Sequence, residues 1–195
     1  MHDRRNLEWR LNWYRQSELD GALLLGGLVR LSRDPYLVQQ LTKHCADEAR
    51  HSWLWERTIV QLGLATVRIR RSYQSFYRDE LGLPRSMTEA LALTHVFEQR
   101  VHQQFTEDLA EPGLPEAVRR TLKTLIRDEE AHLDWIARWL ASRAGATAML
   151  SRYREADERI YCRLVGYRDR SWEIDDISEA KCHTAERQHS TQASA

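Results

Sequence analysis

The sequence is poor in cysteine, proline and glycine, and neither sign of charge is in excess. Its 195 residues contain three cysteines, four prolines and eight glycines, and 29 basic side chains balance 29 acidic ones. An odd number of cysteines without a Cys-x-x-Cys pair argues against a rubredoxin-type iron site and a structural zinc site, and favours a reducing, cytoplasmic compartment. A net charge of zero argues against strong attraction to nucleic acid or to an anionic membrane.

Long apolar segments are absent as well. No run approaches the roughly 18 residues that are needed to cross a bilayer. The mean hydropathy is −0.64, so we expect a soluble protein with no membrane partner. Residues 1–10 are charged and begin a helical pattern, so we expect no secretory signal there. A chain of this length is expected to form one domain with a tail.

What the sequence does contain is helical periodicity along most of its length. Apolar residues recur at steps of three and four, which is typical of amphipathic helices. Asp34 followed by Pro35 is a typical helix start, and Gly63 and Gly145 follow helix ends. The predicted helices span about 3–31, 35–62, 87–110, 115–143 and, with a more polar composition, 147–167.

The lengths of the connections predict how these helices are arranged. Residues 64–86 form the longest break, and a bundle with a long middle connection has one crossover. We therefore predict an all-α fold, an antiparallel four-helix bundle with one long crossover and an additional C-terminal helix. Its parts are the bundle at 1–145, an accessory fifth helix at 146–168 and a tail at 169–195. We expect the tail to be mobile, because its last residues, from about 178, are rich in Ser, Thr, Gln, Glu and His.

Four glutamates and two histidines repeat one pattern along the four long helices. A lone glutamate is followed by Glu-x-x-His and the same order then recurs, giving the series Glu18, Glu48 and His51, Glu98, Glu129 and His132. Twenty-nine residues separate the first lone glutamate from its Glu-x-x-His pair, and thirty separate the second. This distance is about half a helix, a short turn and half of the next helix. Because positions i and i+3 share one helix face, all six side chains are expected to converge inside the bundle.

The surroundings of these side chains are apolar. Around Glu18, for example, apolar residues recur at helical steps, namely Leu11, Tyr14, Ala22, Leu25 and Val29. A buried carboxylate needs a partner, and the apolar stripes contain too little Lys and Arg to neutralise four glutamates. Two divalent ions would neutralise them, so we predict a dimetal centre in which the six residues are metal ligands and catalytic residues. A buried network of ordinary salt bridges is the alternative.

Two segments carry a resemblance to a known family. Residues 127–135 look like the corresponding helix of bacterioferritin and rubrerythrin, with the sequence Arg-Asp-Glu-Glu-Ala-His-Leu-Asp-Trp. Residues 47–51 read Asp-Glu-Ala-Arg-His and are similar to the Asp-Glu-x-Arg-His signature of diiron oxygenases. Over roughly residues 5–145 the chain resembles the ferritin-like diiron carboxylate superfamily.

The resemblance implies which metals are bound and how. It implies two iron ions, with a mixed manganese–iron centre or manganese alone as alternatives. It further implies that Glu48 and Glu129 bridge the metals and that Glu18 and Glu98 are terminal ligands. Ala49 stands where bacterioferritin has its haem-binding methionine, so we expect no haem.

Three further residues are candidates for supporting the centre. Metal-binding histidines usually donate their second N–H to a carboxylate or carbonyl. Asp47 is expected to orient His132 in this way, unless it is simply a solvent-facing acid. Asp128 is expected to orient His51, with the same alternative. Tyr14, one turn before the first lone glutamate, is a candidate hydrogen-bond donor or radical relay, unless it is simply a core residue. The remaining histidines on these helices could approach the metal, but are rather expected to serve packing or the surface, because six ligands already complete the pattern; they are His44, His95 and His102.

The expected chemistry follows from a carboxylate-rich dimetal centre. We expect a non-haem diiron oxidoreductase that activates dioxygen to oxidise a small or carrier-tethered organic substrate, with an external electron donor. The Asp-Glu-x-Arg-His signature, the basic and aromatic crossover at 67–78, the fifth helix and the tail favour this function. A ferritin- or rubrerythrin-like ferroxidase or peroxidase that handles iron or peroxide is the alternative. The third possible function is that of a helical partner-binding module with a structural metal. Tryptophans along the long helices suit a homodimer.

Overall fold

Helices make up most of the computed structural model, which describes residues 3–177. In chain order they are α1 (Arg4–Leu31), α2 (Pro35–Gln61), α3 (Tyr73–Leu81), α4 (Met87–Leu109), α5 (Glu116–Ala141), α6 (Ala146–Val165) and the 3-10 helix η1 (Arg168–Asp176). No strand occurs within residues 3–177, and the five long helices begin and end within two residues of their predicted bounds. The predicted all-α class is therefore confirmed. No helix in this range is both long enough and apolar enough to cross a membrane.

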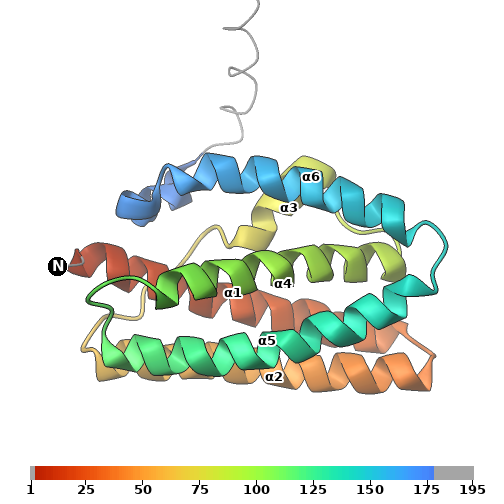
Figure 1. Cartoon of the computed structure of the whole chain (residues 1–195), viewed down its shortest axis with the longest axis horizontal. Coiled ribbons are helices and arrows are strands. Elements are labelled where there is room, and N and C mark those ends of the chain that lie inside the picture. The colour runs from red at the N-terminus through yellow and green to blue at the C-terminus, as the bar shows by residue number, and fades with distance from the viewer. Residues whose placement is uncertain (1–2, 178–195) are drawn as a thin grey trace, which may run out of the picture.

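The four longest helices lie side by side and form a helical bundle (Figure 1). α1 packs along α2, α4 packs along α5, and contacts between α2 and α5 join the two pairs. The short connections at 32–34 and 110–115 make the two helices of each pair run in opposite directions. α6 lies along the outer side of α4, and α3 contacts both α6 and α1. Each pair therefore brings the middle of one helix level with the middle of the next.

Capping residues determine where two of these helices begin. The carboxylate of Asp34 accepts the backbone N–H groups of Tyr36 (3.0 Å) and Leu37 (3.4 Å) at the start of α2. The hydroxyl of Ser86 accepts the N–H of Glu89 (3.1 Å) at the start of α4. Such caps satisfy amide groups that have no partner within the helix. They set the register of α2 and α4, and with it the position of the glutamates at mid-helix.

The connection between α2 and α4 is more regular than predicted. We expected an irregular crossover at 64–86, but α3 lies within it. Its residues Tyr73, Phe76 and Tyr77 recur at helical steps and are at most 4% exposed, so burial of their aromatic rings stabilises this short helix. Gly82 ends it with a φ of 77°, in the left-handed region that glycine adopts without steric cost.

The start of the predicted tail is also structured. Residues 169–176 belong to η1, which packs on α1. Ile174 and Ile177 are buried, and the backbone N–H of Ser171 donates to the side-chain oxygen of Asn6 (2.9 Å). Two buried isoleucines and hydrogen bonds to Asn6 therefore hold this polar segment on the bundle. The remainder of the predicted tail, 178–195, lies outside the described residues.

Apolar side chains close the bundle on both sides of a polar middle section. One core cluster contains Trp55 and Leu122, and the other contains Leu41 and Ile136. On both α2 and α5 the predicted metal ligands fall between a residue of one cluster and a residue of the other. The polar section is therefore isolated from water at both ends of the bundle.

Candidate metal centre

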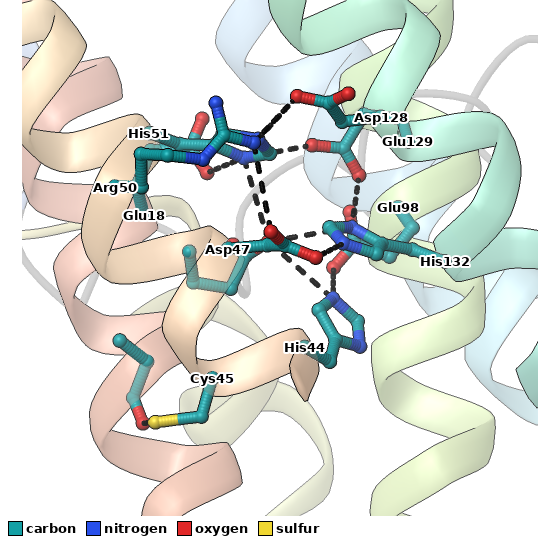
Figure 2. A network of polar contacts seen from close by, with 12 residues as sticks. Glu18, His44, Cys45, Asp47, Arg50, His51, Glu98, Asp128, Glu129 and His132 are labelled. Carbon is teal, nitrogen blue, oxygen red and sulfur yellow. Dashed lines mark hydrogen bonds and ion pairs between the residues drawn. The ribbon is translucent and has the colours of Figure 1, made fainter. Parts of the chain in front are cut away.

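The six predicted ligands come together inside the bundle. α1 and α4 each supply one glutamate, and α2 and α5 each supply a glutamate and a histidine (Figure 2). None of the six side chains is more than 4% exposed, and the set is Glu18, Glu48, His51, Glu98, Glu129 and His132. The helix register predicted from the spacing therefore brings the six residues together in one buried cluster, although they are spread over more than one hundred positions of the sequence.

The first of two groups surrounds His51. Its Nδ1 atom lies 3.4 Å from Oε1 of Glu129 and 3.6 Å from Oε1 of Glu48. The same nitrogen lies 3.7 Å from Oε2 of Glu18. Ligand atoms of these four residues all lie within 4.8 Å of one another, so together they can hold a metal ion.

The second group contains a histidine that was not predicted. His44 Nε2 lies 3.3 Å from Oε1 of Glu48 and 3.3 Å from Oε1 of Glu98. Its ring stacks on that of His132, with the ring centroids 3.7 Å apart. These four residues also have ligand atoms within 4.8 Å of one another, and Glu48 belongs to both groups.

The expectation that His44 serves packing or the surface was therefore incomplete. The side chain is 1% exposed, and it faces two of the predicted ligands. The sequence does contain a signal for it, because positions i and i+4 also share a helix face and His44 precedes Glu48 by four residues. His95 and His102 belong to neither of the two groups.

Unsatisfied polar atoms test whether these residues fit a metal. Four buried atoms that face the cluster have no hydrogen-bond partner, namely His44 Nε2, Glu48 Oε1, His51 Nδ1 and Glu129 Oε1. Buried polar atoms are nearly always paired, because an unpaired one costs its full desolvation energy. Cations bound in the two groups would together satisfy all four, and the donors suit a divalent transition metal. The residues present therefore fit a metal ion.

Two aspartates hold the histidines from the outside. Nε2 of His51 lies 3.3 Å from Oδ2 of Asp128, and Nε2 of His132 lies 3.4 Å from Oδ2 of Asp47. These are the crosswise contacts expected from the sequence. When each Nε2–H donates to its aspartate, the Nδ1 lone pair faces the cluster and is available to a metal.

Arg50 links the two aspartates and was given no role by the sequence analysis. Its guanidinium donates to Oδ2 of Asp128 (2.7 Å) and lies 3.5 Å from Oδ1 of Asp47. The arginine and the hydrogen bond to His51 outweigh partial burial and lower the pKa of Asp128. This carboxylate therefore stays ionised as an acceptor for the imidazole.

Tyr14 belongs to the buried core, which is the alternative given for it above. Its hydroxyl donates to Oδ2 of Asp108 (2.5 Å), next to Arg10 and Arg168. Among the described residues, no hydrogen bond joins the hydroxyl to any of the six predicted ligands. The buried Asp108 competes for this donor, and the sequence pattern around Glu18 contains no sign of it. Tyr14 instead contributes its ring to the wall of a pocket.

Two pockets of different character reach the cluster. The first is lined mostly by aromatic and aliphatic side chains and reaches Glu18, with Trp13, Tyr14, Tyr73, Phe97, Val101 and Phe105 among its residues. It shares Trp13, Tyr14, Tyr73 and Gln104 with a neighbouring pocket under α6 and η1. The other lies between α2 and α5 and is lined by Lys43, His44, Asp47, His132, Asp134 and Arg138, among others. The cluster is thus approached from an apolar side and from a polar side.

Burial shifts the proton affinities of the cluster in the absence of metal. Burial, and then the neighbouring Glu129, raises the pKa of Glu98 to about 8. Burial is also the largest cause that raises the pKa of Glu129 to about 7 and that of Glu48 well above its usual range. Burial lowers the pKa values of His44 and His132. The metal-free cluster therefore relieves carboxylate repulsion by retaining protons, which a bound cation would displace.

Comparisons of the chain with models of protein families, with curated proteins and with solved structures find no match. What is established is a helical bundle with buried carboxylates and histidines that can hold a metal ion. This is compatible with the ferritin-like diiron superfamily, and the function has to be inferred from the cluster itself.

The metal-free protein is predicted to lose stability as the pH rises. Glu98 and Glu129 have raised pKa values of about 8 and 7 in the folded state and 4.5 without the fold. Their contribution to stability is therefore complete below about pH 4.5 and is lost as the pH rises through 7 and 8. We expect the Tm measured with a chelator to fall by several degrees between about pH 6.5 and 9.

Two comparisons accompany these melting curves. A divalent metal should remove most of the fall, because the carboxylates are then ionised at every pH of the series. Glu98→Gln, which cannot ionise, should show a shallower fall than the unaltered protein. A Tm in chelator that is constant or rises over this range would contradict the protonated cluster.

Gly21 permits a close approach between α1 and Glu48. A Cβ atom at Gly21 would lie 3.0 Å from Oε2 of Glu48, whereas a Cβ at Gly27 would have no neighbour within 4 Å. We expect Gly21→Ala to displace the shared carboxylate and weaken metal binding by about tenfold or more. Gly27→Ala is the matched control, and it should leave metal affinity unchanged while stabilising α1 by about 0.5–1 kcal/mol. Competition with a chromophoric chelator measures both affinities, and equal losses in the two variants would refute the interpretation.

Proposed function

We propose that this chain is a ferritin-like four-helix bundle with a non-haem diiron centre, and that it activates dioxygen to oxidise an organic substrate. The observation that supports this most strongly is the pair of buried groups that share Glu48, one of which adjoins an apolar pocket at Glu18. A metal with a purely structural role needs neither two positions nor a pocket beside one of them. We therefore favour an oxidoreductase over a partner-binding module.

Two iron ions suit the two groups of ligands. In this proposal Glu48 would contact both ions, because it belongs to both groups, whereas Glu129 belongs to one group and would hold a single ion. Glu18 and Glu98 are terminal ligands. When bound, two ferrous ions supply electrons for the reduction of dioxygen. Manganese suits the same ligands and can take one or both positions.

The protein's own residues hold this centre and control access to it. Asp47 and Asp128 fix the orientation of the two imidazoles that they contact, and Arg50 holds both aspartates. The apolar clusters at both ends keep bulk water away from the carboxylates. Positioning of the substrate then falls to the pocket that reaches Glu18.

The character of this pocket favours an organic substrate. Its walls are largely Trp, Tyr, Phe and Val side chains, which bind a small apolar or aromatic group and offer little to a hydrated ion. Gln104 adds a polar group to its lining that could orient such a molecule, whereas the guanidinium of Arg100 already pairs with Asp157 and Glu158. The substrate class proposed is therefore a small, largely apolar molecule or the corresponding end of a carrier-tethered one.

A ferroxidase or peroxidase is the second candidate. The pocket between α2 and α5 is polar, reaches His44 and His132, and includes the carboxylates Asp47 and Asp134. Such a passage suits Fe²⁺ or peroxide better than an organic molecule. The number of iron ions oxidised per chain separates this candidate from the first.

Partners and location complete the proposal. An external electron donor and a cytoplasmic site of action are expected for such an enzyme. The crossover at 67–78 is less basic than its sequence suggests, because Arg71 pairs with Asp79 and Arg70 lies 3.7 Å from Asp176. A homodimer is also proposed, because Trp53 is 59% exposed.

Loss of the shared glutamate tests the centre. Unaltered protein reconstituted with Fe²⁺ without oxygen should bind about two iron ions per chain and consume dioxygen when it is admitted. Glu48→Ala should lose most of the iron and the oxygen uptake, because it removes a ligand of both groups. Glu130→Ala, which alters the exposed neighbour of Glu129, should retain both properties. Elemental analysis and an oxygen electrode measure them.

The outcomes of this test are distinct. Absence of bound metal in the unaltered protein, or full metal content in Glu48→Ala, would refute the proposed centre. Oxidation of many iron ions per chain would favour the ferroxidase function over the oxidase function.

Filling the apolar pocket tests the class of substrate. Val101 lines the pocket without belonging to either ligand group, so Val101→Phe should reduce the volume beside Glu18. We expect it to bind the same amount of iron but to lose at least tenfold in the ability of small aromatic molecules to stimulate oxygen uptake. Val60→Phe adds the same group at a position that is 66% exposed and should behave like the unaltered protein. Equal stimulation in both variants would exclude this pocket as the substrate route.

A further inference from the structure

His44 breaks the internal repeat of the bundle. Residues of α2 correspond to residues of α5 at an offset of 81, which pairs Asp47 with Asp128, Glu48 with Glu129 and His51 with His132. At the same offset His44 corresponds to Leu125, a core residue with 0% exposure. One half of the repeat thus places an imidazole where the other half has an apolar side chain.

The imidazole of His44 is not held by hydrogen bonds. Among the described residues, neither of its buried nitrogens has a partner in hydrogen-bond geometry, although Nε2 lies 3.3 Å from an oxygen of Glu48 and from an oxygen of Glu98. A histidine that served packing alone would leave two polar atoms unsatisfied in the core. A metal bond to Nε2 gives this nitrogen a partner, and the ring stack with His132 then keeps it in place (Figure 2).

The extra histidine makes the two groups chemically different. The group with His44 offers two imidazoles and two carboxylates, and the other group offers one imidazole and three carboxylates. Imidazole nitrogen favours the later divalent metals, whereas carboxylate oxygen favours harder ions. The polar pocket also reaches the group with His44 directly.

We propose, on the basis of the dimetal centre proposed above, that its two positions are unequal and fill in a fixed order. The position made by His44, Glu48, Glu98 and His132 binds first and more tightly for an ion that favours nitrogen ligands. The position made by Glu18, Glu48, His51 and Glu129 fills second. His44 is thus a seventh ligand that determines the order of filling.

Titration with Co²⁺ tests this order. Co²⁺ binds imidazole and carboxylate, and its unpaired electrons shift the proton NMR signals of the histidines that it contacts. We expect calorimetry to resolve two steps that differ by about tenfold or more in affinity. The first equivalent should shift signals of two histidines, and the second should add those of one more.

Two variants separate a ligand from a packing residue. His44→Leu introduces the residue found at the corresponding position of α5, so the core should stay filled. We expect it to lose about tenfold or more in the first step, so that the two steps merge, and to show one histidine fewer at saturation. His95→Leu removes a buried histidine outside both groups and should titrate like the unaltered protein.

The outcomes distinguish failure of this inference from failure of the proposed centre. Two equal steps in the unaltered protein, with His44→Leu unchanged, would overturn the unequal positions and leave the dimetal centre intact. Absence of Co²⁺ binding in the unaltered protein would overturn both. If His44→Leu does not fold, the unaltered protein still tests the proposed order of filling. The order is contradicted if the first equivalent of Co²⁺ shifts the signals of only one histidine.

Discussion

The structure depends on the burial of four carboxylates at one level of a helical bundle. Glu18, Glu48, Glu98 and Glu129 are at most 4% exposed, and mutual repulsion in such surroundings is strong. The metal-free protein relieves it with protons, which is why burial raises the pKa of Glu98 to about 8. In the metal-free protein, lone pairs at the centre of the cluster still have no hydrogen bonds. A bound cation would remove both the repulsion and the unpaired polar atoms, so the fold would be most stable with metal bound.

The rest of the bundle positions these charges from outside. Apolar clusters on both sides prevent water from reaching them. Asp47 and Asp128 reach across to the histidine of the opposite helix, and Arg50 ties the two aspartates together near the surface. Because α2 and α5 are cross-linked in this way, a change in one imidazole is transmitted to the other helix. The ligands are therefore arranged by packing and hydrogen bonds before any ion arrives.

Helical periodicity and spacing were enough to predict the five long helices and the convergence of six ligands, because both follow from residues within single helices. The remaining features depend on contacts between helices. The proximity of Gly21 to Glu48 arises from the close approach of α1 to α2, which no pattern within α1 reveals. Asp108 draws the hydroxyl of Tyr14 away from the cluster. His44 could have been recognised from its position four residues before Glu48, but the repeated pattern of six ligands has no corresponding second histidine.

The two pockets relate the inequality of the metal positions to the proposed function. The apolar pocket reaches Glu18, which belongs to the position with three carboxylates, while the polar pocket reaches His44 and His132. Carboxylates can change between one and two bonds to a metal, whereas an imidazole offers a single nitrogen. In the proposed centre, the ion nearer the organic substrate would therefore be the one whose ligands can rearrange to open a coordination site. The ion on the polar side would be held by two imidazoles and would serve as the fixed partner, so an extra histidine on one side alone would give two otherwise similar positions different roles.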